Sequence, residues 1–220
     1  MVEIIASDAL KLKVPELQLL CIECDVISGE TTDELWEYLS LRCAEISSRL
    51  KVEEISSMPA IRASRAAYKA CGKDPARYRL SAEALLRRIV KGESLYRISN
   101  IVDIINLVSI STGFSIGGYD AGKIRGTIRF GIGAKDELYS GIGRGELNIE
   151  GLPVFRDDQG AFGSPTSDSV RTSVDGNTRR FLMVIIGFGA CELLQDAGKM
   201  AVQLLSEFAA AKNPEVKIIS

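Results

Sequence analysis

Two polar side chains that could do chemistry lie in the most apolar stretch of this 220-residue chain. Asp103 and Asn106 fall between residues 100 and 112, among seven Ile, Leu and Val residues. This pattern predicts a helix buried on nearly every face, with the two polar groups one turn apart on one side. An unpartnered buried polar group costs about 1–3 kcal/mol, so both need hydrogen bonds. The pair therefore belongs either to an internal network or to the wall of a ligand pocket. Glycines at 113, 117 and 118 favour the pocket, because a ligand can approach a backbone without side chains.

The absence of histidine removes several classes of active site. Ser-His-Asp and Cys-His nucleophiles and His-ligated catalytic zinc are excluded. Cys21 and Cys24 have the spacing of half a zinc site, but no second pair follows, and residues three apart in a strand point to opposite faces. We expect no metal and no cofactor. Any reaction would depend on carboxylates, hydroxyls, Lys, Arg, backbone amides and positioned water.

The elements that must position these groups follow from periodicity and turn residues. Strands are predicted at 2–6 and 18–27, and Thr31 with Glu34 forms a capping box that opens a helix to about Leu50. Short strands are predicted at 115–118, 127–131, 138–139, 152–155 and 180–188, with a long polar loop at 156–177. Gly141, Gly143 and Gly145 lack the context of a nucleotide-binding loop and predict a hairpin turn. A helix with a core-facing stripe is predicted at about 191–211.

Charge is unevenly distributed along the chain. Residues 62–97, predicted to be helical, carry ten basic and three acidic side chains, a net charge of +7. The whole chain has a net charge of −2, so the remainder carries −9. Tyr68 and Tyr78 lie among these basic residues, a mixture that suits a phosphate backbone with stackable bases. A solvated helical face, or arginines paired with acids elsewhere, would give the same pattern.

Length and composition predict one folded α+β domain at residues 1–220, with a helical basic N-terminal half packed on a mainly antiparallel sheet. Within it we distinguish an extension at 1–60, a core at 61–190 and a C-terminal helix at 191–220. The longest apolar run, at 181–188, is too short to span a bilayer, and no secretion signal is recognisable. We expect a cytoplasmic protein that does not contact membranes.

The ordered motifs Val102-Asp103-Ile104-Ile105-Asn106, Gly113-x-x-x-Gly117-Gly118-Tyr119-Asp120 and Ile124-x-Gly126 resemble the B3/B4 module of bacterial phenylalanyl-tRNA synthetase β subunits. The resemblance covers roughly residues 60–190, and the segment from Arg65 to Arg88 resembles free-standing relatives of that module. In the synthetase the module hydrolyses tRNA charged with the wrong amino acid. The resemblance therefore implies a stand-alone aminoacyl-tRNA editing hydrolase acting in trans, with mischarged tRNA as its partner. Ligation of phenylalanine to tRNA is not implied.

The resemblance also suggests site residues, although this chain departs from the family pattern. Gly117 stands where the family has a pocket histidine, Tyr96 where it has an arginine, and residues 164–168 replace its Gly-Gly-Glu segment, while Thr178 is retained. We therefore expect a small polar pocket and a mischarged amino acid other than tyrosine. The catalytic candidates are Asn106, Asp168 and Thr178, and the substrate-binding candidates are Gly117, Gly118, Thr166, Arg171 and Thr172. The candidates for binding nucleic acid are Arg62, Arg65, Lys69, Arg77, Arg79, Arg87 and Arg88.

Two other functions stay open at this point. The chain could be a catalytically inactive module that binds tRNA or another RNA, with an affinity that falls steeply as salt rises. It could also be a small-molecule protein that binds an amino acid, in which case the free amino acid would raise its melting temperature and tRNA would not.

Overall fold

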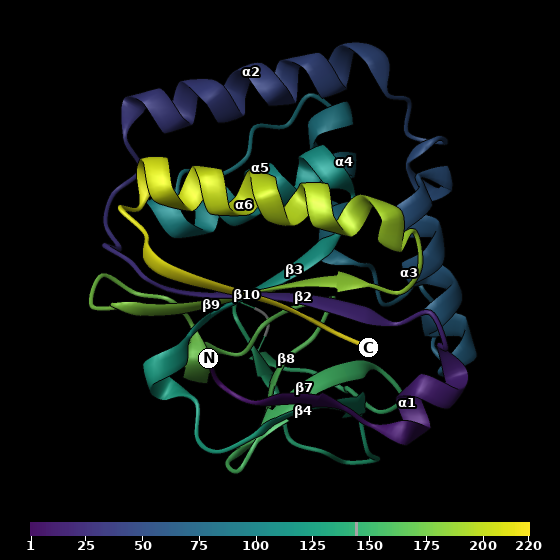
Figure 1. Cartoon of the computed structure of the whole chain (residues 1–220). Helices are drawn as coiled ribbons and strands as arrows, with labels where there is room; N and C mark the ends of the chain where they lie inside the picture. Colours follow the sequence, from purple (N-terminus) through teal and green to yellow (C-terminus); the bar gives the residue numbers. More distant parts are fainter. Residues whose placement is uncertain (144) are drawn as a thin grey trace.

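The chain folds into three stacked layers, shown in Figure 1. The structure is a computed structural model that describes residues 1–143 and 145–220. A helical layer lies above a four-stranded sheet, and a second four-stranded sheet lies below it. The helices are α1 (Asp8–Lys13), α2 (Asp33–Arg49), α3 (Pro59–Ala70), α4 (Ser81–Val90), α5 (Asn100–Thr112) and α6 (Leu194–Phe208). The predicted α+β class is confirmed.

The central sheet has the order β10-β2-β9-β3 and is entirely antiparallel. Its strands are β2 (Gln18–Asp25), β3 (Ser115–Asp120), β9 (Arg180–Gly187) and β10 (Lys212–Ile219). The second sheet has the order β1-β4-β7-β8, and only its β1–β4 pair is parallel. Its strands are β1 (Ile4–Ala6), β4 (Ile128–Ile132), β7 (Pro153–Asp157) and β8 (Gly160–Gly163). Two short strands, β5 (Ser140–Gly141) and β6 (Gly145–Glu146), form a separate hairpin, as the glycine spacing predicts.

Burial on both faces explains the continuous apolar runs of β2 and β9. On β9, Met183 and Ile185 pack under the helices, whereas Leu182 and Val184 pack against the second sheet. β2 alternates in the same way, so Cys21 and Cys24 point into different layers, as their spacing predicts. All five cysteines are free, and no group of three metal-binding side chains occurs within 1–143 and 145–220.

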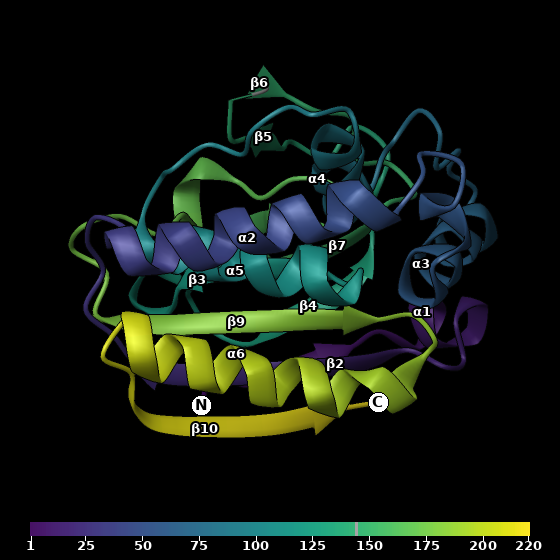
Figure 2. The ribbon, with the colours of Figure 1, turned by 90° about the horizontal axis from the view of Figure 1, so that it is seen from above.

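Helix α5 lies under α2 and beside α6, and both α5 and α6 pack on the central sheet (Figure 2). The Ser99 hydroxyl caps its first turn, and Gly113 ends it with a φ of 79°. Asp103 is fully buried and accepts hydrogen bonds from the Thr31 hydroxyl at 2.5 Å and the Ile98 amide at 3.3 Å. Thr31 is thus part of this network, and the predicted capping box is wrong by one residue, because Thr32 caps α2.

The secondary structure differs from the prediction in three further places. The 156–177 segment is not one loop, because it contains β8 and a 3-10 helix at Val170–Thr172. The final helix ends at Phe208, and β10 follows it as a strand that the sequence pattern did not predict. Residues 138–139 are not in a strand. No helix in the described part of the chain is long and apolar enough to cross a membrane.

The Asn100 side chain joins three segments at the start of α5. Its amide group donates to the carbonyls of Ile27 and Phe208 at 2.9 and 3.0 Å, and its oxygen accepts from the Gly29 amide at 3.0 Å. Replacing Asn100 by Ala would remove the hydrogen-bond partner of all three part-buried backbone groups. We expect urea denaturation to show a loss of about 2–4 kcal/mol in the free energy of unfolding. Asn177→Ala, at an exposed turn, should change it by less than about 0.5 kcal/mol, and equal losses in both variants would contradict this account.

Candidate functional site

Three tyrosine hydroxyls converge on the segment from Ser164 to Asp168, which we call the 164–168 loop. Tyr68 of α3 hydrogen-bonds the Thr166 hydroxyl at 2.9 Å. Tyr139 donates to the Ser167 carbonyl at 2.5 Å, and Tyr119 of β3 donates to the Asp168 carboxylate at 2.9 Å. These three hydrogen bonds therefore connect the loop to α3, to β3 and to the segment just before β5.

Asp168 is the titratable group at the centre of this arrangement. Its carboxylate accepts a hydrogen bond from the Tyr119 hydroxyl at 2.9 Å, and the backbone amides of Gly118 and Ser164 act on it in the same direction. These donors favour the charged form, but burial opposes it more strongly and raises the pKa of Asp168 to about 7. A carboxyl group with this pKa can exchange a proton near neutral pH, which is what a general acid or base requires.

A cavity of about 280 Å³ opens beside the 164–168 loop. Ser164 and Thr166 line it together with Arg77 and Tyr78. Asp168 is the last residue of the same loop, although it does not itself line the cavity. The geometry thus joins the basic segment to the polar loop, two features that lie far apart in the sequence.

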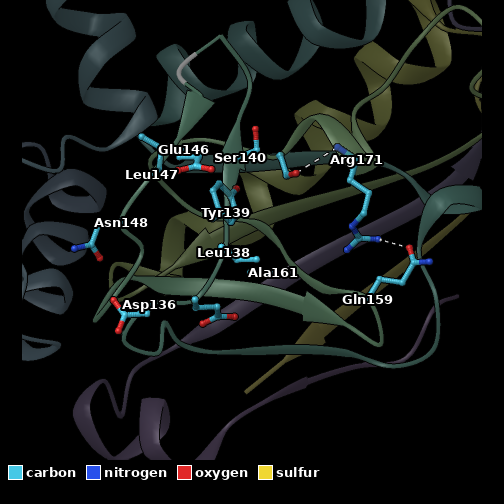
Figure 3. Close-up of a pocket in the computed structure, with 12 residues that line it drawn as sticks. Asp136, Leu138, Tyr139, Ser140, Glu146, Leu147, Asn148, Gln159, Ala161 and Arg171 are labelled. Atoms are coloured by element: carbon cyan, nitrogen blue, oxygen red, sulfur yellow. Dashed lines mark hydrogen bonds between the residues drawn. The ribbon is translucent and has the colours of Figure 1, made fainter.

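A larger cavity of about 720 Å³ lies on the other side of the β5–β6 hairpin (Figure 3). Tyr139, Ser140, Gln159 and Arg171 are among the residues that line it. Arg171 is not a free cation there, because it pairs with the Asp157 carboxylate at 2.8 and 3.0 Å and donates to Gln159 at 3.0 Å. Its guanidinium also lies 5.6 Å from the centre of the Phe162 ring. The structure therefore places Arg171 away from the Thr166 cavity and gives it a structural partner.

The hollow expected beside Gly117 and Gly118 is filled by core side chains. A Cβ at Gly117 would lie 2.1 Å from the Tyr119 hydroxyl oxygen, and one at Gly118 would lie 2.2 Å from Ile105 Cδ1. The glycines leave space for these neighbours and not for a ligand side chain. Gly118 still affects the site, because its backbone amide favours the charged form of Asp168 and so lowers the pKa of that carboxyl group.

The three candidate threonines and Asn106 do not line one common pocket. Thr178 is fully buried and donates to Asp120 at 2.9 Å, so its hydroxyl is not available to a ligand. Thr172 is also fully buried, and its hydroxyl has no hydrogen-bond partner within the described ranges. Thr166 lines the cavity, whereas Asn106 is half-buried on α5 and lies outside the cavity's lining.

The seven basic candidates separate into paired and exposed groups. Glu83, fully buried on α4, binds Arg65 at 2.8 Å and Arg87 at 2.9 Å, and Arg88 pairs with Glu93 at 3.1 Å. These three arginines are therefore neutralised within the fold. The exposed cations are Arg62, Lys69, Arg77 and Arg79, and they form no ion pair with any residue that the structure describes. Tyr68 is fully buried and cannot stack on a base, whereas Tyr78 is half-buried at the cavity.

Sequence reasoning missed Tyr119 and Tyr139 as members of the site. Tyr119 lies in the Gly-Gly-Tyr-Asp motif that drew attention for its glycines. The useful signal was that a residue without a side chain at 117 precedes a large ring at 119 on the same strand face. Tyr139 gave no comparable signal, because its contact with Ser167 depends on tertiary structure.

Comparisons with known proteins agree with this fold. A family model described as the B3/4 domain matches residues 63–210. Among solved structures, the chain is similar to an N-terminal fragment of the phenylalanyl-tRNA synthetase beta-subunit from Pyrococcus horikoshii, with a TM-score of 0.50 and 17% identity. The alignment covers 100% of this chain and 50% of that one, so the chain spans about half the length of the fragment. At this identity the likeness shows the fold alone. A comparison with curated proteins gives no significant match.

The space beside Gly117 provides a test of the packing around Tyr119. In Gly117→Ala the added methyl group would force the Tyr119 ring to shift, because the two would overlap at 2.1 Å. We expect a loss of about 1–3 kcal/mol in the free energy of unfolding, measured by urea denaturation. Gly176→Ala is the matched control, since nothing lies within 4 Å of its added Cβ. A fully stable Gly117→Ala protein would show that the ring is placed wrongly.

The raised pKa of Asp168 predicts a pH dependence of stability. Between about pH 4 and pH 7 the folded protein keeps a proton on Asp168 that the unfolded chain releases, so the contribution of Asp168 to stability falls as pH rises. Asp168→Asn removes this titration. The free energy of unfolding of the wild type, minus that of the variant, should therefore fall from pH 4.5 to pH 7.5. A difference that is constant or rises with pH would contradict the assignment.

Proposed function

Because the chain belongs to the B3/4 domain family, we propose that it is a stand-alone hydrolase that removes the wrong amino acid from mischarged tRNA. The observation that carries the proposal is the position of Asp168. This carboxyl group, with a pKa of about 7, ends a loop whose residues Ser164 and Thr166 line a cavity that Arg77 also lines. The similar solved structure is a fragment of a tRNA synthetase subunit, which is consistent with a tRNA-related role.

The proposed reaction is hydrolysis of an ester that is already activated. Water attacks the ester carbonyl carbon, and Asp168 orients the water and accepts its proton. The bond to the ribose oxygen of the tRNA terminus breaks, and that oxygen leaves as a hydroxyl after protonation. Holding the acylated end and the water in register supplies much of the rate. Thr166 contacts the amino acid, and no metal or cofactor is required. Asn106 has no part in this step, because it lies outside the lining of the cavity.

The exposed cations give the tRNA a place to bind. We assign Arg77 and Arg79 to the terminal nucleotides, because Arg77 lines the cavity, and Arg62 and Lys69 of α3 to the acceptor stem. Phosphate contacts of this kind produce binding that weakens as salt rises. Arg65, Arg87 and Arg88 contribute less in this proposal, since their charges are already paired.

The direct test is deacylation of a panel of mischarged tRNAs, including seryl, threonyl and tyrosyl forms, by the purified protein. We expect hydrolysis of at least one member, and a loss of roughly 100-fold in rate in Asp168→Asn. Asp158→Asn, which alters an exposed carboxylate, is the matched control and should retain wild-type activity. No hydrolysis above the uncatalysed rate across the panel would contradict an enzymatic role.

One observation favours a second function, a tRNA-binding module without chemistry. Two residues expected to act on the substrate already have partners in the fold. Thr178 donates its hydroxyl to Asp120, and the Tyr119 ring fills the space beside Gly117. In this case Arg62→Glu/Lys69→Glu should abolish tRNA binding, while Arg129→Glu/Lys135→Glu makes the same charge change at two other exposed cations and should not. Arg65 is left unchanged, because a carboxylate there would face buried Glu83. If the wild type binds tRNA without deacylating it, this second function is supported. If Arg62→Glu/Lys69→Glu still binds tRNA, the surface assigned on α3 is contradicted.

A further inference from the structure

Strand β10 forms an open edge of the central sheet. It pairs with β2 on one side only, and it forms the lower border of the molecule in Figure 2. Val216 and Ile218, on the face of β10 that points toward the helices, are 53% and 40% exposed. An unpaired edge of this length is a template for a further strand.

An apolar groove of about 540 Å³ runs along this edge between β10 and α6. Val216 and Ile218 form its floor together with Leu20, and Gly198 and Val202 of α6 form its side. Gly198 brings α6 close to the sheet, since a Cβ there would lie 2.5 Å from Leu20 Cδ1. Exposed apolar surface next to an open edge favours an occupant that supplies both a strand and apolar side chains.

The charges on β10 favour a second β10 strand, from another copy of this chain, as the partner at this edge. When two identical strands pair antiparallel about a twofold axis normal to the sheet, one residue must face itself, and neighbours on either side face each other. An axis through Glu215 or Lys217 would place like charges opposite. An axis through Val216 instead places Glu215 opposite Lys217 of the second copy, twice, with Val216 facing itself. One oxygen of the Glu215 carboxylate also binds the Met1 ammonium group of its own chain at 2.9 Å.

We propose that β10 pairs antiparallel with β10 of a second copy of this chain, about a twofold axis through Val216. The two central sheets then form one continuous eight-stranded sheet. The ladder is centred on Glu215 to Lys217, because a register shift between Lys212 and Glu215 interrupts the strand before it, and Pro214 within that shift has no amide to donate. This inference is independent of the proposed hydrolase activity.

A cysteine at the axis tests the register. Residues that face each other in an antiparallel pair have Cα atoms about 4.5–5.5 Å apart, within the range that a disulfide can bridge. Val216→Cys should therefore form a covalent dimer on mild oxidation, seen on non-reducing gels. Lys212→Cys lies beyond the ladder and should stay monomeric on the same gel, as should the wild type. Equal cross-linking of both variants, or none of Val216→Cys, would overturn the proposal.

A charge exchange tests the pairing without a covalent bond. Analytical ultracentrifugation should show a dimer for the wild type and a dissociation constant raised roughly tenfold in Lys217→Glu, where like charges meet at both pairs. The double variant Glu215→Lys/Lys217→Glu restores opposite charges and should restore the dimer. Lys212→Glu is the control with the same charge change outside the ladder. A wild type that stays monomeric, or a Lys217→Glu protein that dimerises normally, would contradict the pairing.

Discussion

The candidate site depends on one packing constraint, the position of the Tyr119 ring between β3 and β8. Residues 117 and 163 are glycines, and a Cβ at either would lie 2.1 Å from the Tyr119 hydroxyl oxygen. The ring also packs edge-on to Phe162, with centroids 5.0 Å apart. With its orientation fixed, the hydroxyl can donate to Asp168, and the 164–168 loop is tied to the sheet. The glycines therefore serve the site by admitting a side chain, not by leaving a hollow.

Part of the positive charge in residues 62–97 is neutralised by ion pairs within the fold. Buried Glu83 needs positive partners, and Arg65 and Arg87 supply them. A cluster that looks like a nucleic-acid surface in the sequence is thus partly a structural ion-pair network. What remains exposed is smaller and consists of Arg62, Lys69, Arg77 and Arg79. Of these four, Arg77 lines the cavity that contains Thr166 and so links the proposed tRNA surface to the 164–168 loop.

The sequence was informative where local pattern and burial agree. The buried α5, the apolar β9 and the hairpin at Gly141 to Gly145 follow from periodicity and turn residues. β10 was missed because its alternation of charged and apolar residues is short, and its pairing with β2 links residues about 190 positions apart. Asp168 and Thr166 were chosen from the family resemblance. Two features could not be predicted because they depend on tertiary contacts. The Tyr119 ring fills the space beside Gly117, and the Thr178 hydroxyl donates to Asp120.

The most direct test of the central claim is a crystal structure with a non-hydrolysable aminoacyl-adenosine analogue, in seryl, threonyl and tyrosyl forms. The account predicts that the aminoacyl group lies against Thr166 with its carbonyl carbon facing Asp168, and that the adenosine extends toward Arg77. An analogue bound in the cavity lined by Ser140 and Arg171 instead, or bound with no group near the 164–168 loop, would contradict it.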